Sequence, residues 1–118
     1  MYQPERRRWV RHPVNLDSML APVDGRSQPR SATIRNISRG GMCLSALSAI
    51  EPETVIFVLL KTVVKARVVR VALETPDRWR LNCAFVKEMS CPEMEELLPG
   101  HSWLSDPLPA LIGNSLAN

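Results

Sequence analysis

WRLNCAFV, residues 79–86, shows the clearest alternation of apolar and more polar side chains in this sequence. Successive side chains of an extended chain point to opposite faces, so residues two apart share a face. The apolar face of this stretch consists of Trp79, Leu81, Cys83 and Phe85. The period of two predicts a β-strand with one buried face, and we expect Trp79 and Phe85 to lie in the core.

Other short strand-like runs precede this stretch, and turn residues separate most of them. They occupy residues 16–23, 32–37, 42–47, 54–60 and 62–73. Asp24-Gly25, after the first run, is a pair typical of hairpin turns, and no helical period interrupts the series. The pattern predicts a mainly β domain of five or six short antiparallel strands, in a barrel or a sandwich. A barrel is favoured because closure leaves no strand edge exposed.

One helix is expected after the last strand. Ser90 and Glu93 have the spacing of a capping box, Met94 and Leu97 lie on one apolar stripe, and Pro99-Gly100 ends the pattern. The chain is therefore divided into three parts. We expect residues 1–13 to form a basic arm, residues 14–104 to form the barrel with its helix, and residues 105–118 to form a flexible tail.

The composition indicates a single globular domain rather than a disordered chain, with 118 residues, 45% of them hydrophobic and 23% charged. Three cysteines without paired spacing predict neither a zinc site nor a disulfide framework. The longest apolar run is far too short to span a membrane. No nucleophile motif or carboxylate pair indicates catalysis. We expect a cytoplasmic protein that is not an enzyme and needs no metal or cofactor.

Positive charge is concentrated at the start of the chain, where RRRWVR, residues 6–11, holds four arginines. Guanidinium groups bind phosphate in bidentate fashion, grip the O6/N7 edge of guanine, or stack on a base. Alone, such a cluster is usually a solvated charge run.

A second segment changes that interpretation. NISRGG, residues 36–41, lies between two expected strands and offers an amide at Asn36 and a hydroxyl at Ser38. Because these two residues are two apart, they would share a face in extended backbone. Gly40 and Gly41 permit a tight turn, positive φ or close approach of a ligand. Together with the arginines, the segment predicts a pocket for a ligand with phosphates and guanine-like edges.

The two segments resemble the paired RxxxR and (D/N)xSxxG motifs of the PilZ domain family. The resemblance implies a six-stranded antiparallel β-barrel with a C-terminal α-helix that binds the second messenger cyclic di-GMP. It implies that Arg7 and Arg11 hold phosphates and guanine edges, that Asn36 and Ser38 contact a guanine, and that Gly41 shapes the turn. It adds Arg8 as a neighbouring contact, and Arg70 where some relatives present a side chain that stacks under a guanine.

The resemblance further implies a receptor that signals by changing shape, and we expect a downstream protein effector, although self-association or presentation of the reordered arm and tail would also transmit the signal. We expect residues 5–12 to be mobile alone and ordered in the complex, with Trp9 packing the arm against the barrel. Two alternatives remain open. One is a nonspecific nucleic-acid binder that uses the basic arm, and the other is an interaction adaptor of the same fold without a ligand.

Overall fold

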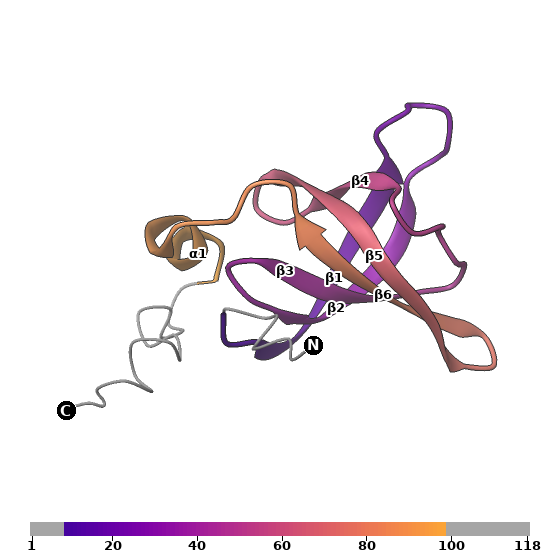
Figure 1. Cartoon of the computed structure of the whole chain (residues 1–118), viewed down its shortest axis with the longest axis horizontal. Helices are drawn as coiled ribbons and strands as arrows, with labels where there is room; N and C mark the ends of the chain where they lie inside the picture. Colours follow the sequence, from indigo (N-terminus) through magenta and orange to yellow (C-terminus); the bar gives the residue numbers. More distant parts are fainter. Residues whose placement is uncertain (1–8, 99–118) are drawn as a thin grey trace, which may run out of the picture.

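The computed structural model describes residues 9–98, which form a closed barrel of six antiparallel strands followed by one short helix (Figure 1). The strands are β1 (His12–Pro22), β2 (Arg30–Ile37), β3 (Gly41–Ala46), β4 (Val55–Leu59), β5 (Val63–Thr75) and β6 (Arg78–Phe85), and the helix is α1 (Cys91–Leu97). Their hydrogen-bonded order is β1-β2-β3-β6-β5-β4, and β4 closes the ring against β1. The predicted six-stranded barrel with a C-terminal helix is confirmed.

The alternation in residues 79–86 has the expected structural cause. Leu81, Cys83 and Phe85 of β6 are buried inside the barrel, whereas Asn82 and Ala84 between them are only half-buried. Trp79 differs from the expectation because it is half-buried and packs against the edge of the core. It stands near the β5–β6 turn, where the barrel no longer surrounds a side chain on every side.

Strand β1 begins earlier than the sequence predicted. It starts at His12 rather than at Leu16, and its register against β2 shifts between Pro13 and Leu16. A proline is tolerated at the start of a strand, and a β-bulge absorbs the local irregularity. As a result Arg11 is the residue directly before β1, and Pro13 is paired with Asn36.

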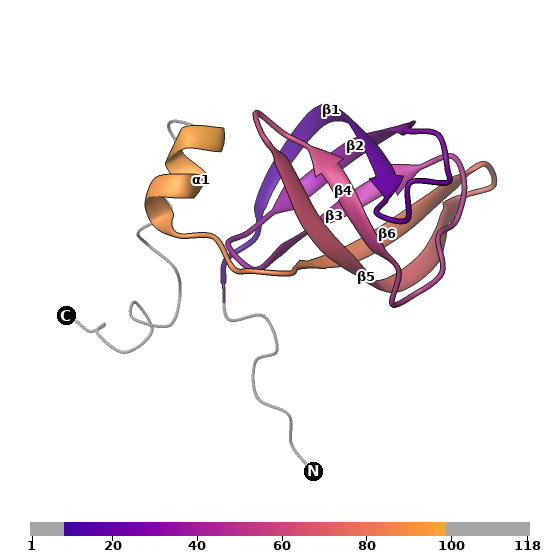
Figure 2. The same ribbon diagram turned by 90° about the horizontal axis from the view of Figure 1, so that it is seen from above.

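The capping box of α1 is present in full. The Oγ of Ser90 accepts a hydrogen bond from the Glu93 backbone N–H at 3.2 Å, and the Glu93 carboxylate accepts one from the Ser90 N–H at 2.7 Å. The bond from the Ser90 N–H stabilises the ionised carboxylate and so lowers the pKa of Glu93. The helix sits at one end of the barrel (Figure 2), and Met94 is its fully buried residue. No helix within residues 9–98 is long and apolar enough to cross a membrane.

The core predicts a clear difference between two leucines. Leu81 is fully buried and Leu47 is 64% exposed. Leu81→Ala should lower the free energy of unfolding by about 2–5 kcal/mol, because it removes buried apolar contacts and leaves a cavity. Leu47→Ala should change it by less than about 0.5 kcal/mol. Urea unfolding followed by tryptophan fluorescence measures both, and equal effects would contradict this assignment of the core.

Candidate ligand site on the barrel surface

Strand register places four residues in one line across the outer surface of the barrel. Asn36 of β2 pairs with Cys43 of β3, Cys43 pairs with Asn82 of β6, and Asn82 pairs with Arg70 of β5. We call Asn36, Cys43, Asn82 and Arg70 the outer row. Adjacent strands are about 4.8 Å apart, so the row is about 14 Å long on a flat sheet.

Two β-bulges direct the ends of this row outward. Ile34 and Val68 are fully buried, and in regular strands the residues two positions later would also point into the core. The register shifts between Ile34 and Asn36, and again between Val68 and Arg70, so each strand gains one extra residue. Each bulge therefore turns a polar side chain away from the core and onto the barrel surface.

The segment after Asn36 is a tight turn organised by Ser38. Its Oγ accepts hydrogen bonds from the N–H groups of Gly40 and Gly41 at 3.1 and 3.2 Å, and its own N–H donates to the Gly41 carbonyl at 2.8 Å. Ser38 follows the last residue of β2 and is only 3% exposed. Its hydroxyl therefore has a turn-forming role, and its contact with a ligand stays a prediction.

The two glycines of the turn serve close packing. Neither Gly40 nor Gly41 has a positive φ. A Cβ at Gly41 would overlap the carbonyl oxygen of Cys83 in the neighbouring strand, and a Cβ at Gly40 would lie 2.9 Å from Cδ1 of Trp9. The first obstacle is backbone, which cannot move without disturbing β6, whereas the second is a side chain.

The described part of the arm contacts this surface. Nη1 of Arg11 donates a hydrogen bond of 2.7 Å to Oδ1 of Asn36. The structure thus brings together one arginine of the first motif and the asparagine of the second, which are 25 positions apart. Arg7 and Arg8 lie outside the described residues.

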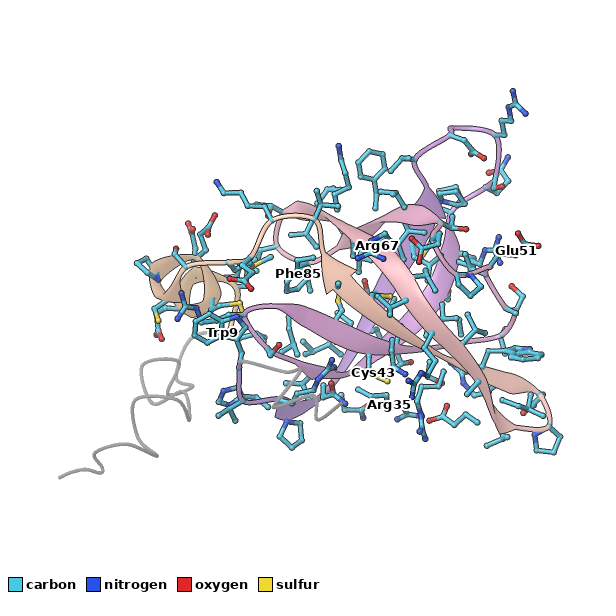
Figure 3. The ribbon with its side chains drawn as sticks, in the orientation of Figure 1. Trp9, Arg35, Cys43, Glu51, Arg67 and Phe85 are labelled. Carbon is cyan, nitrogen blue, oxygen red and sulfur yellow. The ribbon has the colours of Figure 1, made fainter. Side chains whose placement is uncertain are left out.

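Trp9 and Arg39 form a second contact between the arm and the turn. The guanidinium carbon of Arg39 lies 4.0 Å from the centre of the Trp9 ring, a cation–π arrangement. Nε of Arg39 also donates to the carbonyl of Met89 at 2.9 Å, and the Met89 N–H donates to the Arg39 carbonyl at 2.9 Å. Figure 3 shows Trp9 on the side of the barrel that faces α1. The sequence reasoning assigned no role to Arg39, although it lies within the second motif.

A charged cluster flanks the outer row. One carboxylate oxygen of Glu74 lies 3.9 Å from both Arg35 and Arg80, and the other accepts a hydrogen bond from Ser45 at 2.6 Å. Arg78 donates to the same serine hydroxyl at 2.8 Å. The side chain of Glu74 is only 17% exposed. Its negative charge therefore offsets part of the positive charge beside the row.

The thiols near the row are neutral. Burial raises the pKa of Cys83 to about 12 and raises the pKa of Cys43, although the positive charges of Arg80 and Arg11 oppose the latter shift. Figure 3 shows Cys43 close to Arg35. Cys43 is 4% exposed and protonated at neutral pH, so it adds no negative charge to the row. In residues 9–98 no group of His, Cys, Asp or Glu side chains could hold a metal ion.

The comparisons with known proteins agree with this geometry. The family model of the PilZ domain matches residues 5–98, which include both arginine and NxSxxG segments. The chain therefore belongs to the PilZ domain family. No curated protein matches the sequence.

Solved structures with the same fold are distant in sequence. The PilZ domain of YcgR from Escherichia coli, determined with c-di-GMP, gives a TM-score of 0.55 at 16% identity, covering 80% of this chain and 88% of that one. The K. pneumonia MrkH–c-di-GMP complex gives a TM-score of 0.60 at 16% identity, covering 94% of this chain and 54% of that one. The Bacillus subtilis inhibitor of motility MotI/DgrA gives a TM-score of 0.57 at 20% identity, covering 80% of this chain and 48% of that one. The chain thus matches only about half the length of MotI and MrkH.

The contacts of the two glycines predict opposite outcomes for the same substitution. Gly41→Ala should unfold the domain or destabilise it strongly, because its methyl group would overlap the backbone of β6. Gly40→Ala should leave the domain folded and displace Trp9, since a side chain can move. Circular dichroism and thermal unfolding show whether each variant folds, and a change in tryptophan fluorescence shows whether Trp9 has moved. A stable Gly41→Ala protein would contradict the proposed reason for this glycine.

Proposed function

We propose that this domain is a receptor for cyclic di-GMP and that the ligand binds across the outer row beneath the arginine arm. The observation that carries the proposal is the contact between Arg11 and Asn36, because it joins the two family motifs at one point of the surface. Membership of the PilZ family supports the choice of ligand, and two of the structural neighbours were determined with c-di-GMP.

The chemistry of the side chains suits this ligand. The planar guanidinium of Arg11 can donate two hydrogen bonds at once to a phosphate or to O6 and N7 of a guanine. The amide of Asn36 can donate to and accept from a guanine edge. Arg7 and Arg8 would add phosphate contacts from the arm, and Arg70 would stack on a base at the far end of the row. Ser38 and Gly41 would hold the turn that presents Asn36.

Binding would require a rearrangement of the arm. Arg11 donates to Asn36, and both residues are expected to contact the ligand, so the ligand must replace or share this hydrogen bond. Movement of Arg11 would also affect Trp9, two residues earlier, which packs on Arg39. We therefore infer that the signal is a change in the order and position of the arm, read by a protein effector in the cytoplasm.

The charge distribution favours this function over nonspecific binding of nucleic acid. A nonspecific binder uses a broad basic face. Here Arg35 and Arg80 share the carboxylate of Glu74, which reduces the charge that this face presents to a polyanion. The adaptor alternative requires no ligand and predicts no binding of cyclic di-GMP.

Calorimetric titration at fixed salt tests the proposal. Wild-type protein should bind cyclic di-GMP, and Arg11→Ala should weaken binding by about 1.5–3 kcal/mol, because a charge-assisted bidentate contact is lost. Arg11→Lys should also bind poorly, because an ammonium lacks the planar fork. Arg26→Ala is the matched control, since Arg26 is exposed in the loop between β1 and β2, and its affinity should equal that of wild type.

Two further titrations separate the alternatives. GTP and single-stranded DNA should bind much more weakly than cyclic di-GMP at the same salt concentration. Comparable affinity for DNA with a steep salt dependence would favour the nucleic-acid binder. Absence of cyclic di-GMP binding by the folded wild-type protein would favour the adaptor. Unchanged affinity in a folded Arg11→Ala protein would remove the proposed site.

The proposed rearrangement of the arm has its own test. Backbone amide relaxation should show residues 5–11, which precede His12 at the start of β1, to be more mobile than the barrel without cyclic di-GMP and as rigid as the barrel with it. The signals of Trp9 and Arg11 should shift most, because their contacts with Arg39 and Asn36 change. If the arm is rigid before ligand is added and its signals hardly shift, the switch lies elsewhere in the chain.

A further inference from the structure

We infer that Asn82 reads a guanine edge of the ligand and contributes to the preference for guanine over adenine. This inference rests on the proposed function and extends it to a residue outside both family motifs. Asn82 lies in the third position of the outer row, between Cys43 and Arg70.

The position of Asn82 follows from strand register. Asn36 lies on β2 and Arg70 on β5, with β3 and β6 between them. A ligand that contacts both ends of the row must therefore lie over the two intervening positions, which are Cys43 and Asn82. Cys43 is almost fully buried and carries a neutral thiol, so it forms a small, uncharged part of the floor. Asn82 is the polar side chain in the middle of this path.

The side chain of Asn82 has hydrogen-bonding capacity to offer. It is half-buried, and within residues 9–98 its amide has no hydrogen-bond partner. The flanking polar groups are already engaged, because Ser45 bonds to Glu74 and Arg78, and Arg80 lies beside Glu74. A half-buried amide beneath a ligand gains most from a partner, since the ligand would remove the water that otherwise satisfies it.

An amide can distinguish the two purines. Its NH₂ group donates to O6 or N7 of guanine, and its oxygen accepts from N1–H and the N2 amine of guanine. An amide also forms a bidentate pair with N6 and N7 of adenine, so the preference for guanine requires that the Asn82 oxygen accept from the N1–H and N2 edge, where adenine has neither donor. A buried polar group left unpaired disfavours the wrong ligand, which is the usual source of strong discrimination.

Titrations of Asn82→Ala with cyclic di-GMP and cyclic di-AMP test this inference. Affinity for cyclic di-GMP should fall about fivefold, the loss of one neutral hydrogen bond, while affinity for cyclic di-AMP should stay the same or rise. The preference for guanine should fall by at least the same factor. Gln28→Ala is the matched control, because Gln28 carries an exposed amide in the loop between β1 and β2, and both of its affinities should equal those of wild type.

The outcomes distinguish this inference from the proposed function. If wild type and Gln28→Ala bind cyclic di-GMP and Asn82→Ala binds it equally well, Asn82 has no role and the receptor stands. Equal losses for both ligands would also overturn base reading by Asn82. If the folded wild-type protein does not bind cyclic di-GMP, both proposals fail. If Asn82→Ala does not fold, NMR of the wild-type protein tests the contact instead. The side-chain amide signals of Asn82 should shift when cyclic di-GMP is added, and unchanged signals would overturn the inference.

Discussion

The register between β2 and β3 is the constraint on which the alignment of the outer row depends. The turn that joins these strands is closed by Ser38, whose hydroxyl accepts from the N–H groups of Gly40 and Gly41. Gly41 then packs directly on the backbone of β6, with no space for a side chain between them. A slip of one residue would exchange the inner and outer faces of β3. The alignment of Asn36 with Cys43 and Asn82 depends on this turn.

Much of the fold could be predicted because its signals are local. The alternation in residues 79–86 and the capping box at Ser90 are both present as expected. The bulges before Asn36 and Arg70 could not be predicted, because simple alternation places Ile34 and Asn36 on one face. Only the packing of Ile34 inside the closed barrel shows that the strand must shift register to turn Asn36 outward.

The candidate site was predictable in its residue types and less so in their roles. The motif spacing indicated that Arg11 and Asn36 belong together, and they are hydrogen-bonded. The same motif predicted a tight turn, which is present, whereas positive φ is found at neither Gly40 nor Gly41 and Ser38 is buried within the turn. The role of Arg39 could not be predicted from the sequence, because its contacts with Trp9 and Met89 join segments 30 and 50 residues away.

The neutral side chain at position 36 affects how firmly the arm is held. An aspartate there would form an ion pair with Arg11, in which both partners of the hydrogen bond carry a charge. Asn36 offers Arg11 a neutral oxygen instead, so a ligand phosphate would compete for the guanidinium with a charge that the amide lacks. In the proposed receptor, the amide of Asn36 would also bind guanine N–H groups less strongly than a carboxylate would. In the proposed receptor, contacts elsewhere in the outer row would therefore matter more for recognising the base.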